Sequence, residues 1–118
     1  MKKIEEQIIK TFRTQCNNNN YNTEITLSPH DKVEGYAQEI IIYRLDDRAI
    51  FRYEPKEQRF SFTLAGYNTP DTRSRLKALL GSFCNVLFFQ KQGKVYLVDN
   101  DVKIGINSNT WYQFKLRR

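Results

Sequence analysis

Residues 39–64 read EIIIYRLDDRAIFRYEPKEQRFSFTL, and this stretch decides the fold because apolar and polar residues alternate along it. A period of two is typical of β-strands that are buried on one face. Two turn signals divide the stretch: Asp46-Asp47 suits a two-residue hairpin turn, and residues 54–57 contain a proline. The expected strands are residues 39–45, 48–53 and 58–64. Together they predict an antiparallel meander.

The pairing register of this meander can be predicted from its turns. If Leu45 pairs with Arg48, and Tyr53 with Gln58, one face of the three strands is mostly apolar. The expected apolar face consists of Ile40, Ile42, Ala49, Phe51, Phe60, Phe62 and Leu64. The opposite face is mixed with arginine and consists of Ile41, Tyr43, Ile50, Arg52, Arg59, Ser61 and Thr63.

An amphipathic helix is expected on each side of the meander. Residues 2–15 carry Ile4, Ile8 and Phe12 at helical spacing, and the asparagines at 17–20 end this helix because asparagine favours loops. The second helix begins at Pro70, with Thr69 as its cap. Its apolar stripe consists of Leu76, Leu79, Leu80 and Phe83.

Shorter segments complete the expected fold. Residues 24–27 alternate as a short strand, residues 86–91 and 94–98 flank Gln92-Gly93 as a hairpin, and residues 102–106 and 111–116 form a second hairpin. The sequence therefore predicts one α+β domain over residues 1–118. Its order is an N-terminal helix, an antiparallel meander, one central helix and two β-hairpins, with about seven strands when 24–27 is included.

Composition limits the class of protein. The chain has 118 residues, 40% of them hydrophobic, which is enough for a core without a disulfide or metal. No apolar run approaches the ~20 residues of a membrane span. Cys16 and Cys84 belong to no CxxC pair, and the N-terminus lacks the apolar stretch of a signal peptide. Reduced thiols and a cytoplasmic location are therefore expected.

Positive charge is concentrated in the later part of the sequence. The net charge is +6, but residues 1–35 contain five basic and five acidic residues, so the excess lies in residues 36–118. No acidic residue occurs between Thr72 and Val98. This segregation favours a polyanionic partner such as nucleic acid, and solubility alone is the simpler alternative.

Three groups of residues are candidates for nucleic-acid binding. They are Arg73, Arg75 and Lys77 on the second helix, Lys91 and Lys94 at the hairpin tip, and Trp111, Lys115 and Arg117 on the last strand. Cations hold phosphates, and an exposed aromatic ring can stack on a base. Each group has a simpler structural explanation: a solvated helix, lysines that protect a strand edge, and a tryptophan that covers the core.

Sequence motifs typical of enzyme active sites are weakly represented in the chain. His30 is the single histidine and has no evident nucleophile partner. Asp71, Asp101 and Lys103 superficially match the PD…(D/E)xK pattern of metal-dependent nucleases, but Asp71 is expected in the first turn of a helix. No phosphate-binding loop and no zinc spacing occur, so we expect no catalytic residues, no metal site and no cofactor.

Residues 66–79 read GYNTPDTRSRLKAL, and this segment resembles small bacteriophage-encoded proteins of unassigned function. Those proteins carry a G-[WY]-x-T-P-x-T-R-x-R-L-x-x-L-like segment between a meander and a short hairpin. The resemblance covers about residues 36–98. It implies a viral origin and a host-cell cytoplasmic setting, and it brings no catalytic residues.

Two non-enzymatic functions follow from these observations. The first is a nucleic-acid-binding module, for DNA or RNA, that uses the three groups named above. The second is an inhibitor or adaptor that binds a host protein through an acidic patch on that partner. A metal-dependent nuclease is the third and least supported function.

Overall fold

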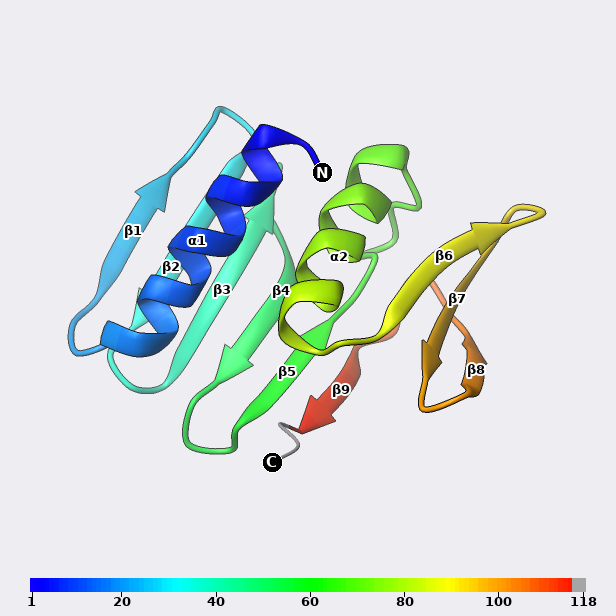
Figure 1. The fold of residues 1–118 in the computed structure, drawn as a ribbon. Helices are drawn as coiled ribbons and strands as arrows, with labels where there is room; N and C mark the ends of the chain where they lie inside the picture. The colour runs from blue at the N-terminus through cyan, green and yellow to red at the C-terminus, as the bar shows by residue number, and fades with distance from the viewer. Residues whose placement is uncertain (116–118) are drawn as a thin grey trace.

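The computed structural model describes residues 1–115 of the chain (Figure 1). The described part contains two helices and nine strands in two antiparallel sheets. The helices are α1 (Lys3–Asn18) and α2 (Pro70–Phe83). The strands before α2 are β1 (Thr23–Thr26), β2 (Asp31–Tyr36), β3 (Ile40–Leu45), β4 (Arg48–Glu54) and β5 (Arg59–Phe62). The strands after α2 are β6 (Leu87–Lys91), β7 (Lys94–Asp99), β8 (Val102–Gly105) and β9 (Tyr112–Lys115).

The larger sheet has the strand order β1-β2-β3-β4-β5-β9, and the smaller has the order β6-β7-β8. Both helices cover the same face of the larger sheet, and the smaller sheet lies beside α2 (Figure 1). The predicted α+β class and the order of helix, strands, central helix and strands are confirmed. Neither helix is long and apolar enough to cross a membrane, within the residues that the structure describes.

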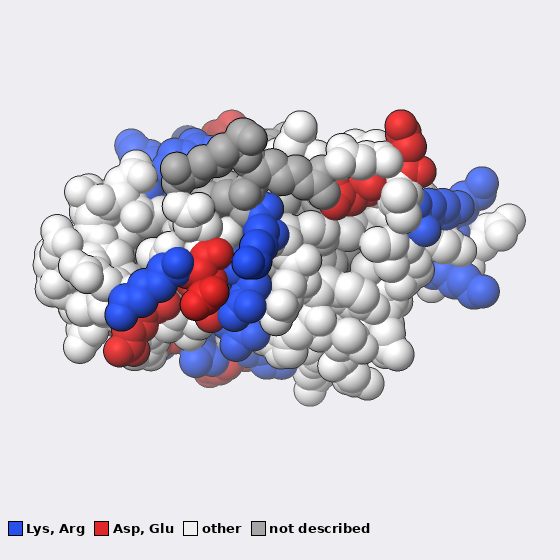
Figure 2. Space-filling model, turned by 90° about the horizontal axis from the view of Figure 1, so that it is seen from below, with Lys and Arg blue, Asp and Glu red and all other residues white. Residues whose placement is uncertain are grey.

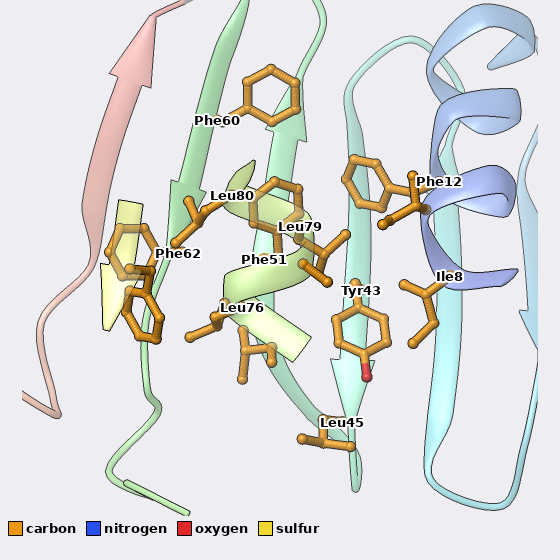
Figure 3. Close-up of a cluster of buried hydrophobic side chains, with 14 of the residues drawn as sticks. Ile8, Phe12, Tyr43, Leu45, Phe51, Phe60, Phe62, Leu76, Leu79 and Leu80 are labelled. Atoms are coloured by element: carbon orange, nitrogen blue, oxygen red, sulfur yellow. The ribbon is translucent and has the colours of Figure 1, made fainter. Parts of the chain in front are cut away.

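The core lies between the two helices and the larger sheet (Figure 3). The ring of Phe12 on α1 lies 5.1 Å from that of Phe51 on β4, measured between centroids. On α2, Leu76, Leu79 and Leu80 are fully buried, as their helical spacing predicted. The apolar faces of both helices therefore point at the sheet, and the opposite face of that sheet is left without a helix.

The predicted faces of the meander are partly wrong, and a β-bulge is the reason. Leu45 pairs with Arg48 as expected, but the register shifts between Tyr43 and Arg44, so that Tyr43 pairs with Phe51. The bulge leaves Ile50 without a partner in the ladder. As a result Ile41, Tyr43 and Leu45 are buried, whereas Ile40 and Ile42 are only half-buried.

The pairing of β4 with β5 also differs from the prediction, but without changing the faces. Tyr53 pairs with Phe60 instead of Gln58, which is a shift of two positions. Because side chains alternate with a period of two, this shift keeps Phe60 and Phe62 on the same face as Phe51. The expected apolar members of β5 are therefore buried as predicted.

The last strands pair differently from the expected second hairpin. Strand β8 pairs with β7, and β9 returns to the larger sheet, where it pairs with β5. Strand β2, which was not predicted, separates β1 from β3. The smaller sheet is therefore inserted between two neighbouring strands of the larger one.

Candidate nucleic-acid interface

One face of the smaller sheet combines lysines with aromatic rings. Lys91 pairs with Lys94 and Phe89 with Tyr96, and the same ladder places Lys103 opposite Val98. Residues that are paired directly across antiparallel strands share a face. This lysine–aromatic face consists of Leu87, Phe89, Lys91, Lys94, Tyr96, Val98, Lys103 and Gly105. Among the described residues, no Asp or Glu occupies a position on it.

The other face of the smaller sheet fixes this orientation. Phe88, Val95 and Leu97 alternate with the residues above and are buried in the core. The ring of Phe88 packs edge-on against Phe62 of β5, with 5.9 Å between centroids. Because one face is held against the core, the lysine–aromatic face must point away from it.

The side chains on the lysine–aromatic face lie close enough to act together. The rings of Phe89 and Tyr96 are 5.6 Å apart. The Lys103 Nζ lies 4.3 Å from the centroid of Tyr96, which is a cation–π contact. Lys91 and Lys94 are exposed at the turn, directly opposite each other. Like charges in this arrangement are mildly destabilising, so folding does not require them.

A shallow groove of about 430 Å³ continues from this face. Lys94, Tyr96 and Gly105 line it on the side of the smaller sheet, and Asn68 and Asn107 line it from two loops. The two loops are joined because the Gly66 N–H donates to the Ser108 carbonyl, 2.8 Å away. The groove therefore lies between the smaller sheet and the loops at residues 65–69 and 106–110.

The three predicted cations of α2 have different surroundings. The Arg73 Nη1 donates to the main-chain oxygen and to the Oδ1 of Asn68, at 2.9 and 2.7 Å, so this arginine lies beside the groove. Lys77 is exposed on the side of α2 that faces the start of α1, together with Ser74. Arg75 is buried, at 9% exposure. The structure therefore brings Arg73 to the candidate interface and takes Arg75 away from it.

Arg75 belongs to a buried network of charges. Its Nη1 lies 3.2 Å from the Glu5 Oε2 and its Nε lies 3.0 Å from the Asp31 Oδ1. Burial alone would raise the pKa of both carboxyls, but hydrogen bonds lower it: Ser74, Arg75 and a main-chain N–H donate to Glu5, and Arg75, Ser28 and Tyr43 donate to Asp31. Both carboxylates are charged at neutral pH, and Arg75 holds α2 to β2 and α1.

The third predicted group lies on the open face of the larger sheet. Tyr112 stacks on Phe62 inside the core, so Trp111 and Lys115 alternate to the face without helices. There the guanidinium of Arg52 lies 3.7 Å from the centroid of the Trp111 ring. A similar stack joins Arg48 to Tyr67, at 3.6 Å. Arg117 lies outside the described residues.

Charges on the open face of the larger sheet, the face without helices, are largely paired. Lys32 lies 3.1 Å from Glu24, and Arg59 lies 3.0 Å from Glu54. Figure 2, in which the molecule is seen from below, shows acidic and basic atoms side by side. In contrast, basic atoms project at the edge where Figure 1 has the β6–β7 turn, and the nearby acidic atoms lie nearer the middle. The predicted basic groups therefore do not share one face.

The residues weighed for catalysis are His30, Asp71, Asp101 and Lys103. His30 is exposed, with its Nδ1 2.6 Å from the Asp46 Oδ1. Asp71 lies in the first turn of α2, and Asp101 lies in the turn between β7 and β8. Within residues 1–115 no cluster of His, Cys, Asp and Glu could hold a metal ion.

Comparison with models of protein families relates the chain to a known family. The model described as Kyanoviridae Gp96 protein matches residues 1–116. The chain belongs to this family. The Kyanoviridae Gp96 family consists of bacteriophage proteins, so the viral origin that the resemblance implied is confirmed. The specific segment at residues 66–79 stays a prediction. No curated protein and no solved structure matches this Gp96 family member.

Sequence reasoning missed three members of the candidate interface in this Gp96 family member, namely Phe89, Tyr96 and Lys103. The signal was present, because pairing the strands about Gln92-Gly93 places Phe89 opposite Tyr96. Lys103 could not be placed in this way, since residues 102–106 were expected to pair with the last strand instead of β7. Placing Lys103 on this face required the pairing of β8 with β7, which the sequence analysis did not predict.

Proposed function

We propose that this phage protein is a non-enzymatic module that binds single-stranded nucleic acid through the lysine–aromatic face. The observation that carries the proposal is the gathering of Lys91, Lys94 and Lys103 with Phe89 and Tyr96 on one face that points away from the core. Unpaired bases stack on aromatic rings whatever their sequence, while lysines neutralise the phosphates between them. DNA and RNA both offer these groups.

The face has features that a purely structural surface would not need. Two exposed lysines oppose each other at the turn, and a third ammonium covers the Tyr96 ring. Lys103 is exposed, so its side chain can leave the ring when a base takes its place. Arg73, beside the groove, adds a further cation at one end of the face.

The test is a binding titration over a salt series. Fluorescence anisotropy would follow a labelled oligonucleotide of about 12 nucleotides, as DNA and as RNA. With three lysines on phosphates, the slope of log K against log salt should be about −2.1, so affinity should fall roughly 18-fold between about 50 and about 200 mM salt. The triple variant K91A/K94A/K103A should remove most of this binding.

A charge-matched control separates a specific surface from net charge. Lys3, Lys10 and Lys56 are exposed and lie outside the lysine–aromatic face, and K3A/K10A/K56A removes the same charge. The control should bind nearly as well as the wild type. An equal loss in both triple variants, or no wild-type binding at about 50 mM salt, would refute the proposal.

A second candidate function is binding to a host protein, and one observation favours it. Leu87 on β6 is 67% exposed and Val102 on β8 is 59% exposed, so the smaller sheet also presents aliphatic side chains. This alternative predicts that one host protein co-purifies with the chain after nuclease treatment. Either partner would be met in the host cytoplasm, which is the location we propose.

A further inference from the structure

We infer that the groove beside the lysine–aromatic face is a nucleotide subsite that prefers thymine or uracil. This inference rests on the proposed function and concerns where a bound strand would be read. The groove offers hydrogen-bond donors and an aromatic ring, and no carboxylate among the described residues lines it. Its occupant must therefore supply acceptors.

Asn68 presents its amide nitrogen because its oxygen is already used. The Oδ1 of Asn68 accepts from the Arg73 Nη1 at 2.7 Å, and the same Nη1 donates to the main-chain oxygen of Asn68 at 2.9 Å. Because an arginine guanidinium can only donate, the bond to Oδ1 identifies the oxygen end of the side-chain amide. The Nδ2 has no acceptor within residues 1–115 and retains both of its N–H groups for a ligand.

Asn107, on the other loop, also has its amide oxygen already used as an acceptor. Its Oδ1 accepts from the main-chain N–H of Asn109 at 3.3 Å, and its own main-chain N–H donates to the Tyr112 hydroxyl at 2.8 Å. Its Nδ2 also has no acceptor in the described part of the chain. With the Lys94 ammonium on the facing side, the groove has donors from β7 and from both loops.

Tyr96 connects this groove to the rest of the interface. It lies on the lysine–aromatic face and also lines the groove. The glycines at 93 and 105 line the groove as well, and a Cβ at either position would meet no atom within 4 Å. The groove is therefore open beside Tyr96, which is where the next nucleotide of a strand stacked on the face would lie.

The donor set selects among the bases. Thymine and uracil carry two carbonyl oxygens, O2 and O4, which flank N3 on one edge of the ring and can each accept from a separate N–H group. Cytosine has one carbonyl and a donor amino group, and adenine has an amino group and only ring-nitrogen acceptors. Amide donors from the two joined loops on one side of the groove therefore match the two carbonyl oxygens of thymine or uracil.

The experiment compares homopolymers and asparagine variants of the full chain. Anisotropy titrations would use thymidine, cytidine and adenosine DNA strands of about 12 nucleotides at one salt concentration. The wild type should bind the thymidine strand several-fold more tightly than the adenosine strand, since each hydrogen bond contributes about fivefold. In N68A/N107A the ratio should fall close to one, while the salt slope stays unchanged.

Two further variants keep the result interpretable. Asn68→Asp retains an oxygen for Arg73 but removes the donors, so it should lose the preference without releasing Arg73. The matched control N17A/N18A removes two exposed amides on α1 and should keep the wild-type ratio. A thermal melt of each variant shows that it is folded.

The outcomes distinguish this inference from the function on which it rests. If K91A/K94A/K103A loses binding but N68A/N107A keeps the wild-type ratio of the two homopolymers, the groove assignment is overturned and the binding function stands. If the wild type binds none of the strands, both are overturned. A loss of preference in N68A/N107A and in Asn68→Asp, with the control unchanged, supports the subsite.

Discussion

Replacing Arg75 by methionine tests the network that holds α2 against β2 and α1. Met fills a similar volume but leaves Glu5 and Asp31 without their cation, and these residues are only 4% and 2% exposed. Removing one partner of a buried ion pair typically costs about 3–5 kcal/mol of unfolding free energy. At about 4 °C per kcal/mol for a domain of this size, the melting temperature should fall by roughly 12–20 °C.

The pH dependence of this loss identifies its cause. The pKa of Glu5 is held below its ordinary value of 4.5, and that of Asp31 below 3.8. Their contribution to stability is therefore present above those values and is lost as the pH falls through the lowered pKa. Without Arg75, burial raises both pKa values, so the carboxyls of the variant become neutral at a higher pH. The difference between wild type and variant should shrink from pH 7 toward about pH 3.

The assay is urea unfolding at several pH values, followed by the fluorescence of Trp111, the single tryptophan. Arg73→Met is the matched control, because it removes an arginine from the same helix at a partly exposed position and should cost only about 0.5 kcal/mol or less. A loss below about 1 kcal/mol for Arg75→Met, or a loss that does not change with pH, would refute the role given to the network.

Three further predictions concern other parts of the fold. Gly35→Ala should cost about 1–3 kcal/mol in urea unfolding, because its Cβ would lie 3.0 Å from the Asn19 Oδ1, whose amide is anchored to the main chain of β2. The Cys84 thiol should react slowly with thiol reagents at pH 8 in the folded protein, since burial raises its pKa to about 12; rapid reaction would contradict this. The imidazole of His30 should titrate above 6.5 by NMR, because Asp46 accepts its hydrogen bond, and Asp46→Asn should return the midpoint toward 6.5.

Local patterns were sufficient for most of the elements. Both helices followed from apolar spacing and from the cap at Thr69, whose hydroxyl accepts from the Thr72 N–H at 3.2 Å. Strand β2 was not predicted, because its buried positions are Asp31, Val33 and Gly35 instead of three apolar residues. The strand does alternate, but its buried carboxylate belongs to the network of Arg75. Gly35 makes room for the polar side chains of Gln15, Asn19 and Thr23.

Long-range pairings were the part that sequence could not supply. Nothing near Arg75 indicates burial, because its partners lie 44 and 70 positions away along the chain. Because of the bulge at Ile50, the side chains of β3 lie on the faces opposite to those predicted, although the turn at Asp46-Asp47 was predicted correctly. The lysines at the hairpin tip were found because Gln92-Gly93 fixes their pairing locally, whereas Lys103 depended on which strand β8 joins.

The pairing of β5 with β9 has a consequence for the synthesis of the protein. Phe62 and its partner Tyr112 are 50 positions apart, so β5 leaves the ribosome roughly 3–10 s before β9 can join it. During that interval β5 is an edge strand with unpaired main-chain groups and two phenylalanines, which is a template for association between nascent chains. Slowing translation between residues 62 and 112 should therefore increase aggregation during synthesis without changing the stability of the finished fold.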